Sequence, residues 1–324
     1  MHPAFSVIFL TTLIGAGQGL FLALVTAEAF SHIGALTAQE HHFYSTGSLL
    51  SLSLLVAGLV ASFFHLGHPE RAWRSAAMWR TSWLSREVIA LPAFMSIVFI
   101  YGLLHYLNWN PKVFGTTALP ETSLTLMVGI VGIVLCFTLF ICTGMIYACL
   151  KFLQEWHTPL TPINYTLLGM SSGFTLATAF ATQYSQELTS LFGTWAIIFT
   201  LAALLTRTAS LLRNKRIKYR STLRTAIGVH HNNIQQQSQG SMGGSFNTRE
   251  YFHGMSAAFL KSVKWVFLLL VFPLPLLLIG MGLSNDATAL LVSAFTVQYV
   301  GLIAERWFFF AQANHPQNLY YQTI

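Results

Sequence analysis

The chain has 324 residues, of which 54% are hydrophobic and only 8% are charged, and its formal net charge at pH 7 is +7. A soluble globular protein of this length needs far more polar surface, so the composition excludes that class and indicates an integral membrane protein. The basic residues cluster in loops between apolar segments, where orientation in the bilayer explains them better than nucleic-acid binding does.

The apolar runs are long enough to cross a bilayer as helices, which takes about 20 residues. In chain order, we expect eight such helices at 5–28, 46–66, 86–107, 123–149, 162–184, 188–212, 257–283 and 287–311. Only the short polar stretch from Tyr184 to Glu187 separates the fifth run from the sixth. The runs do not alternate with a period of two, so they predict one all-α membrane domain over 1–324 rather than a β-barrel.

Orientation follows from the positive-inside rule, which compares Lys and Arg near the ends of the spans. If both termini are cytoplasmic, every Lys and Arg except Lys112 falls on the cytoplasmic side. We therefore expect both termini in the cytoplasm.

The one long loop, about 213–256, is expected on the cytoplasmic side and changes character midway. Its first part, 213–220, is basic and suits anionic lipid head groups or an acidic partner. Its second part, 232–249, is rich in Gln, Ser, Asn and Gly, as flexible linkers are. The loop ends with aromatic side chains among charges, as at protein contacts: Arg249, Tyr251, Phe252 and His253.

The cysteines and histidines do not predict a bound metal. Cys136, Cys142 and Cys149 all fall in the fourth run, and three cysteines cannot build a four-thiolate iron–sulfur cluster, so we expect them to be packing residues. No two histidines are expected at the same depth in the bilayer, where a pair would be needed to hold haem. The sequence therefore predicts no metal site, haem or iron–sulfur cluster in this chain.

The polar run from His65 to Glu87 joins the second and third apolar segments. His65 and Pro69 fit the end of one helix, and Ser85 fits the N-cap of the next, with Glu87 in its first turn. Caps explain single residues, but not so many ionisable groups at adjacent ends of two antiparallel helices. Such groups at membrane depth are costly and usually functional.

An imidazole and a carboxylate beside an apolar cleft suit a lipid-soluble quinone, whose two-electron reduction takes up two protons. His65 can donate or accept a proton near neutral pH, and Glu87 can do so if it is partly buried. Nearby arginines would stabilise negative charge on the bound ring, and a tryptophan would line the cleft or anchor the chain in the interface. This wider quinone-binding set is Arg71, Arg74, Trp83, Ser85 and Arg86.

The run His65-Leu-Gly-x-Pro-x-Arg-Ala-Trp73, followed by Trp79-Arg-x-Ser-Trp-Leu-Ser-Arg-Glu87, resembles the membrane anchor subunits of dimethyl sulfoxide reductases, within the broader polysulfide-reductase and NrfD-type anchors. The resemblance covers nearly the whole chain. Stretches at 1–8, 15–19, 156–165, 243–254 and 305–307 are most similar to the anchors of cytoplasmic sulfite dehydrogenases, the SoeC type.

This resemblance implies a protein without a redox cofactor of its own, which exchanges electrons with ubiquinone or menaquinone. Its implied partners are a four-cluster ferredoxin-like iron–sulfur subunit and a molybdopterin catalytic subunit, on the cytoplasmic face of the inner membrane. The chain itself would not act on the substrate of the complex. The family's quinone-site histidine and glutamate carry over onto His65 and Glu87, and the end of the long loop becomes a docking surface for the iron–sulfur subunit.

Three alternatives stay open. Sulfite oxidation would reduce quinone at this site with cytoplasmic protons, whereas a sulfoxide reductase would oxidise quinol there; the inner-face position favours the first. A secondary transporter should show interrupted helices or internal repeats, and the nearest approach, Gly15–Gly19, is explained by close helix packing. A purely structural anchor without a quinone site is the third.

Overall fold

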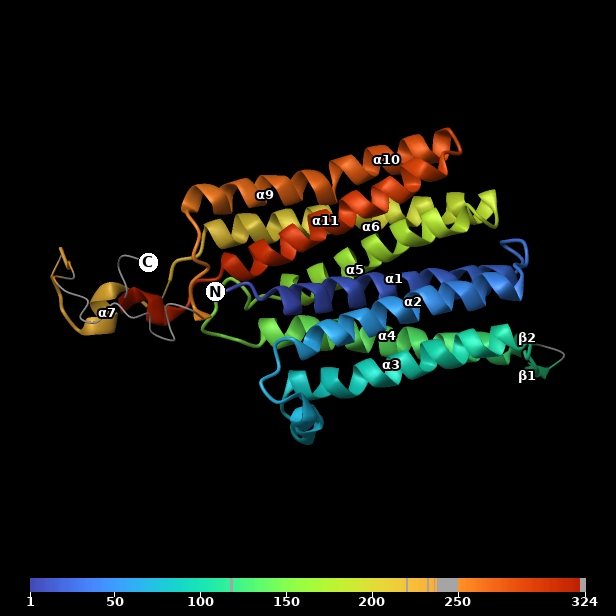
Figure 1. The fold of residues 1–324 in the computed structure, drawn as a ribbon, viewed down its shortest axis with the longest axis horizontal. Coiled ribbons are helices and arrows are strands. Elements are labelled where there is room, and N and C mark those ends of the chain that lie inside the picture. The colour runs from blue at the N-terminus through green and yellow to red at the C-terminus, as the bar shows by residue number, and fades with distance from the viewer. Residues whose placement is uncertain (117–118, 220, 232, 236, 238–249, 321–324) are drawn as a thin grey trace.

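The computed structural model describes residues 1–324 except 117–118, 220, 232, 236, 238–249 and 321–324, and it shows a bundle of long helices lying side by side (Figure 1). The long helices are α1 (Phe5–His32), α2 (His41–Phe63), α3 (Trp83–Tyr106), α4 (Leu124–Ala148), α5 (Leu160–Ala181), α6 (Gln186–Lys215), α9 (Ala257–Val271), α10 (Pro273–Ser284) and α11 (Thr288–Ala311). The short elements are the 3-10 helices η1 (Pro69–Met78) and η2 (Pro316–Tyr320), the helix α7 (Leu223–Ile227), and the antiparallel strands β1 (Lys112–Thr116) and β2 (Leu119–Ser123). The predicted all-helical class is confirmed.

Seven segments of the described chain are long and apolar enough to cross a membrane: α1, α2, α3, α4, α6, α9 with α10, and α11. They match seven of the predicted runs, although α2 begins at His41 rather than 46. The predicted run 257–283 breaks at Phe272, because Pro273 has no N–H to continue the helix. The fifth predicted run is α5, a helix of 22 residues whose many Ser and Thr side chains are buried in the bundle.

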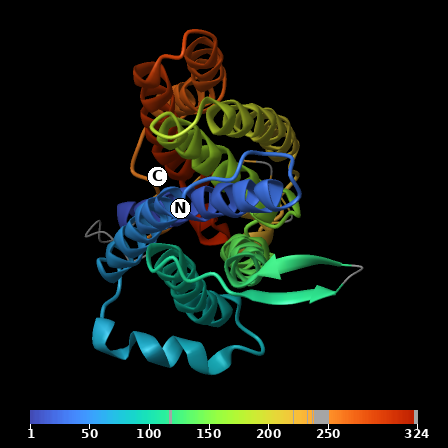
Figure 2. The same ribbon diagram turned by 90° about the vertical axis from the view of Figure 1, so that its right-hand side faces the viewer.

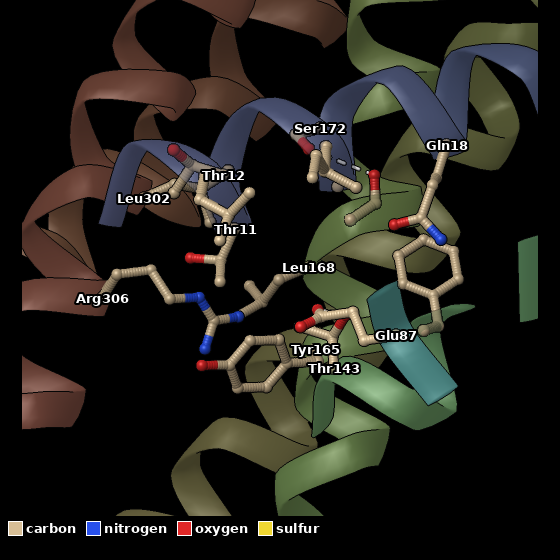
Figure 3. Close-up of a pocket in the computed structure, with 15 residues that line it drawn as sticks. Thr11, Thr12, Gln18, Glu87, Thr143, Tyr165, Leu168, Ser172, Leu302 and Arg306 are labelled. Carbon is tan, nitrogen blue, oxygen red and sulfur yellow. Dashed lines mark hydrogen bonds between the residues drawn. The ribbon is translucent and has the colours of Figure 1, made fainter. Parts of the chain in front are cut away.

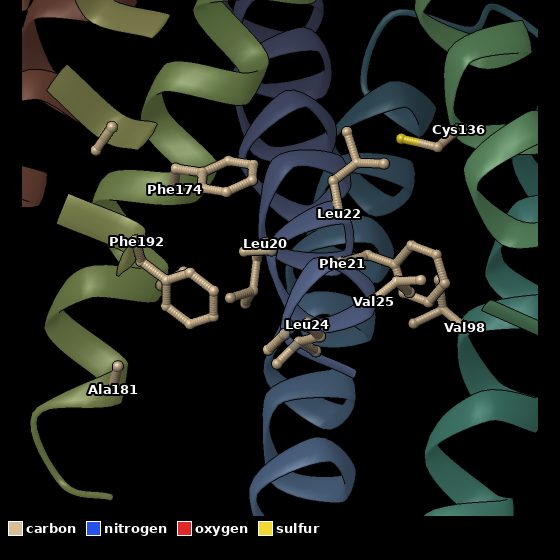
Figure 4. Close-up of a cluster of buried hydrophobic side chains, with 14 of the residues drawn as sticks. Leu20, Phe21, Leu22, Leu24, Val25, Val98, Cys136, Phe174, Ala181 and Phe192 are labelled. Atoms are coloured by element: carbon tan, nitrogen blue, oxygen red, sulfur yellow. The ribbon is translucent and has the colours of Figure 1, made fainter. Parts of the chain in front are cut away.

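Helix α1 lies at the centre of the bundle and packs against α2, α4, α5 and α11. Phe21 meets the ring of Phe94 edge-on, with 5.3 Å between centroids. Figure 4 shows residues of α1 flanked by Phe174 and Phe192 on one side and by Val98 on the other. This buried apolar layer joins helices that are far apart in the sequence.

Glycines bring α1 and α5 into backbone contact. A Cβ atom on Gly19 would lie 2.4 Å from the carbonyl oxygen of Gly169 and 2.8 Å from the Cα of Gly173. Small residues four positions apart on each helix allow this approach, as is common between membrane helices. The expected packing role of Gly15–Gly19 is therefore confirmed.

The two ends of the bundle differ in charge. One end carries η1, α7 and η2, and we call it the basic end because the described Lys and Arg residues, apart from Lys112, lie there (Figure 1). The opposite end carries β1 and β2 with the α1–α2, α5–α6 and α10–α11 connections, and it faces the viewer in Figure 2. The hairpin of β1 and β2 was not predicted.

Candidate functional site

The caps around the polar run differ from the prediction. Helix α2 ends at Phe63, so His65 lies two residues beyond it. Ser82, not Ser85, caps α3, and its hydroxyl oxygen accepts a hydrogen bond from the backbone N–H of Ser85 at 3.3 Å. Because α3 begins three residues earlier than expected, Glu87 lies in the second turn and not at the helix entrance. Helix-end stabilisation therefore does not explain Glu87.

His65 stands on the loop between α2 and η1. Partial desolvation lowers the pKa of its imidazole from the ordinary 6.5, so the neutral form prevails near pH 7. The segment 63–79, which contains His65, exposes a set of large apolar side chains that we call the aromatic corner: Phe63, Phe64, Trp73, Met78 and Trp79. Phe64 is 83% exposed and Trp73 is 71% exposed. An exposed apolar patch of this kind marks contact with lipid, a ligand or another protein.

The predicted arginines of η1 are held at the surface. Arg71 pairs with Glu70, with 3.6 Å between Nε and the carboxylate oxygen. The Arg74 guanidinium lies over the ring of Trp73, 5.6 Å from its centroid. Arg74 therefore contacts the aromatic corner through Trp73, and Arg71 lies on the same 3-10 helix.

The predicted residues at the start of α3 serve to hold η1 against the helix. Arg86 donates hydrogen bonds to the backbone carbonyls of Trp79 at 2.9 Å and Arg80 at 2.7 Å. Its guanidinium also lies over the ring of Trp83, 4.3 Å from the centroid. Ser85 is buried, with 3% of its surface exposed. These contacts fix the corner between η1 and α3.

Glu87 points into the bundle, where it lines a cavity of about 20 Å³ (Figure 3). The Thr143 hydroxyl donates a hydrogen bond to Glu87 Oε1 at 2.5 Å. Tyr165 and Arg306 line the same cavity, and the Arg306 guanidinium lies 3.7 Å from the centroid of the Tyr165 ring. A cavity of this volume holds a water molecule and is too small for an aromatic ring. His65 is not among its lining residues.

Arg306 also belongs to a buried cluster of charges. Arg207 Nε lies 2.8 Å from Glu305 Oε1, and Arg306 Nε lies 3.4 Å from Glu305 Oε2. The side chains of all three are at most 5% exposed. This cluster was not predicted, because both arginines were counted as loop charges. The sequence could have predicted their burial, because both arginines lie inside the apolar runs 188–212 and 287–311, where a charged side chain usually faces the protein interior.

A second buried cluster lies at the opposite end. Glu28 accepts hydrogen bonds from the hydroxyl groups of Tyr101, at 2.7 Å, and Thr125. His105 Nε2 lies 3.7 Å from the Glu28 carboxylate, and its Nδ1 lies 3.0 Å from Nδ1 of His41. His41 and His105 therefore contact each other at the outer ends of α2 and α3, a contact that the sequence did not predict. The contact was missed because α2 begins before the predicted start and includes His41.

Two of the cysteines behave as packing residues. Cys136 and Cys142 are buried, Cys149 is exposed, and none of the three forms a disulfide. The backbone carbonyl of Cys136 accepts a hydrogen bond from Gln18 at 2.9 Å, which ties α4 to α1. Within the described ranges, no three His, Cys, Asp or Glu side chains converge as a metal site would require.

The predicted docking segment lies against the C-terminal part of the chain. The Tyr251 ring stacks on His315 at 3.7 Å between centroids, and the ring of His253 lies 6.3 Å from that of Trp307. Partial burial lowers the pKa values of His253 and His315. Phe252 is half-buried beside His253, whereas Arg249 falls outside the described residues.

The chain is similar to known proteins over its length. Residues 1–321 match the family described as DMSO reductase anchor subunit (DmsC). A sulfite dehydrogenase subunit from Allochromatium vinosum is 56% identical over 324 residues, and the match covers 100% of both chains. Both findings agree with the resemblance carried by the run from His65 to Glu87.

Proposed function

Because the chain belongs to the family of DMSO reductase anchor subunits (DmsC), we propose that it is the quinone-reactive anchor of a molybdopterin and iron–sulfur oxidoreductase. In this role the multi-pass membrane protein passes electrons between a cytoplasmic iron–sulfur subunit and quinone in the inner membrane. The A. vinosum relative is named as a subunit of a sulfite dehydrogenase, which supports sulfite oxidation as the source of the electrons. Quinone, ubiquinone or menaquinone, would then be reduced by this anchor.

The observation that carries the proposal is the Glu87 carboxylate, which is buried near the basic end and hydrogen-bonded to Thr143. A buried carboxylate without a helix-capping role is costly and is retained where it handles protons or charge. Quinone reduction needs two protons, so a proton-holding group near the electron entry point fits this chemistry.

The quinone ring would bind outside the Glu87 cavity, which is too small for it. We assign the ring to the aromatic corner, because it exposes large apolar side chains in the same segment as His65. His65 would hydrogen-bond one carbonyl oxygen and deliver a proton to it, while Glu87 holds a proton inside the bundle. Arg71 and Arg74 would favour negative charge on the ring. Trp83, Ser85 and Arg86 would keep η1 in position.

The proposed topology has eight crossings with both termini in the cytoplasm. Helix α5 is 22 residues long, or about 33 Å at 1.5 Å per residue, which exceeds the hydrocarbon thickness of about 30 Å. Helices α1 and α11 begin and end at the same end of the bundle, as an even number of crossings requires (Figure 1). The basic residues at that end support its cytoplasmic position.

The iron–sulfur subunit would dock on the basic end, where the described residues 250–253 lie against the C-terminal part of the chain. Tyr251, Phe252 and His253 are half-buried there and offer aromatic surface beside charged groups. Arg249 would add a positive charge to this docking surface. Such a mixture of aromatic side chains and arginine is typical of protein interfaces.

A second candidate is the anchor of a dimethyl sulfoxide reductase, in which this chain would oxidise quinol. The description of the matching family favours it. The two candidates differ in the direction of electron flow and in the substrate of the partner protein, and a single purification can separate them.

The test is to purify the complex from membranes through a tag on this chain and identify the partner proteins. The preparation is then assayed for sulfite-to-quinone and for quinol-to-sulfoxide electron transfer. Sulfite-dependent quinone reduction supports the first candidate, and quinol-dependent sulfoxide reduction supports the second. A protein that purifies without redox partners would overturn both.

The quinone site is tested separately in the same preparation with His65→Ala. We expect weaker binding of a quinone analogue and slower electron transfer, since a hydrogen bond to the ring is lost. Lys112→Ala, at the opposite end, serves as the control. Unchanged affinity and turnover in His65→Ala would remove His65 from the site.

A further inference from the structure

Three adjoining cavities run from Glu87 to the surface of the basic end. The first is the Glu87 cavity, and the second has a volume of about 10 Å³ between α5, α6 and α11. The third has about 380 Å³ and lies between α6, the start of α9 and the end of α11. We call them the inner, middle and outer cavities.

Shared side chains connect the cavities in this order. Tyr165 and Arg306 line both the inner and the middle cavity. Glu155 and Asn214 line both the middle and the outer cavity. Polar side chains thus stand at both junctions, although most of the surrounding helix surface is apolar.

The middle cavity is lined by groups that can hold protons or bind water. Arg207 and Glu305 form their ion pair here. Asn164 donates a hydrogen bond to Ser210 at 2.8 Å and accepts one from Thr206 at 2.7 Å. Because these groups come from α5, α6 and α11, the packing of three helices holds them around one small space.

Some buried polar atoms along the cavities lack a hydrogen-bond partner among the residues that the structure describes. They include Glu155 Oε2, Arg207 Nη2 and Gln312 Nε2. A buried polar atom normally has a partner, and where the protein supplies none, an ordered water does so. These atoms therefore mark positions for water along the middle and outer cavities.

We infer that these polar side chains, together with water between them, form a route that carries protons from the surface of the basic end to Glu87. The inference rests on the quinone reduction proposed above. Two electrons arrive from the iron–sulfur subunit and two protons must reach the ring, and this route supplies protons to Glu87 from the aqueous side. Glu155 takes up the proton at the outer junction, and Glu305 passes it through the middle cavity.

If these buried polar residues only stabilised the fold, the ion pair would be explained, but the series of cavities that leads from it to the surface would not. The pair of Arg207 and Glu305 needs no opening to the surface, and Glu155 is not part of it. Glu155 is 4% exposed, and its Oε1 accepts hydrogen bonds from the Tyr219 hydroxyl at 2.7 Å and the backbone N–H of Asn314 at 3.1 Å. Its second oxygen stays available for water at the mouth of the route.

Several charged groups surround Glu155 and determine the electrostatic potential at its carboxylate. They are Lys215 from α6, Lys264 from α9, the amino group of Met1 and the buried cluster of Arg207, Glu305 and Arg306, and the titratable Tyr219 hydroxyl also contacts Glu155. Burial and the neighbouring carboxylate raise the pKa of Tyr219, so it stays protonated at neutral pH. Positive charges at the mouth repel protons, so a carboxylate at this position is needed to collect them.

The experiment uses Glu155→Gln in the assembled complex, because Gln keeps the acceptor for Tyr219 and removes the titrating group. Quinone reduction is followed after rapid mixing with the electron donor between pH 6 and 9, and quinone-analogue affinity is measured in parallel. We expect the affinity to stay within about two-fold and the rate to fall roughly ten-fold at high pH, with a smaller loss at pH 6. Proton supply is scarcest at high pH.

The matched control is Glu28→Gln, which neutralises a similarly buried carboxylate in the cluster at the opposite end. We expect its pH profile to match the wild type. A second variant, Asn214→Leu, fills the junction of the middle and outer cavities with an apolar side chain, and it should slow the reaction in the same pH-dependent way.

If Glu155→Gln and Asn214→Leu both keep the wild-type pH profile while the analogue still binds, the route is wrong and the quinone site stands. If Glu28→Gln shows the same loss as Glu155→Gln, the effect is not specific to these cavities and the route is wrong. If the wild-type complex binds no quinone analogue, the proposed function itself fails.

Discussion

Glu87 keeps its position through one side-chain hydrogen bond, from Thr143. A Gln at this position accepts the same bond but cannot carry a proton to the quinone. We expect Glu87→Gln to assemble normally and to slow quinone reduction by about 10²-fold or more, the usual contribution of general acid catalysis. Turnover as a function of pH is the measurement, with Thr143→Ser as the control that keeps the hydroxyl donor. An unaltered pH profile would argue against a proton role.

The lowered pKa of His65 determines the pH range in which it can donate a proton. Protonated His65 becomes scarcer as the pH rises through a value below 6.5, so a rate that depends on it falls over that range. We expect this limb of the pH profile to disappear in His65→Gln. The same limb in wild type and variant would assign it to another group.

The buried ion pair of Arg207 and Glu305 is expected to matter for the free energy of unfolding. Arg207→Ala leaves Glu305 short of its nearest partner, which typically costs about 3–5 kcal/mol. Thermal unfolding of the solubilised protein measures this loss. Arg71→Ala is the control, because its surface pair with Glu70 contributes at most about 1 kcal/mol. Equal losses in the two variants would contradict the burial argument.

Part of the site was readable from single residues. His65 and Glu87 stood out because ionisable groups are rare in so apolar a chain, and their role at a quinone site stays a prediction. Tyr165 and Arg306 could not be assigned to the Glu87 cavity, since that requires knowing which helices are neighbours. Periodicity and composition contain no such long-range information.

At the scale of elements, helix boundaries were predicted well where an apolar run meets a polar loop, as at both ends of α4. The start of α2 was missed because His41 and His42 are polar yet helical. The β hairpin was missed because the sequence 112–123 shows no marked alternation of apolar and polar residues. The break at Phe272 follows from a proline that the hydropathy pattern does not register.

The contact of α1 with α5 depends on glycines that admit no side chain. Gly19→Ala puts a Cβ against the backbone of α5, so we expect a loss of about 1–3 kcal/mol from overpacking. Gly280→Ala is the matched control, because a Cβ there meets nothing within 4 Å. Alanine favours helix, so this control should be neutral or slightly stabilising. The measurement is the thermal unfolding of the two solubilised variants, compared under the same conditions.

At the scale of the whole molecule, the charge difference between the two ends predicts the orientation in the membrane. In a Cys149→Ser background, Ala38→Cys and Lys151→Cys place one exposed thiol at each end. We expect a membrane-impermeant maleimide to label Ala38→Cys from outside the inner membrane and to leave Lys151→Cys unlabelled until the cells are opened. The reverse pattern would place the basic end outside.

The apolar central stretch of α1 bears on whether charge can move across the membrane. Between Gln18 and Glu28 the helix rises by about 15 Å, and its residues from Leu20 to Val25 are all apolar and buried. This layer insulates one face of the membrane from the other. If electrons and protons both enter at the basic end, as we propose, no net charge crosses this layer during turnover. On this proposal the reaction is electroneutral, and we expect its rate in sealed vesicles to be the same with and without a membrane voltage.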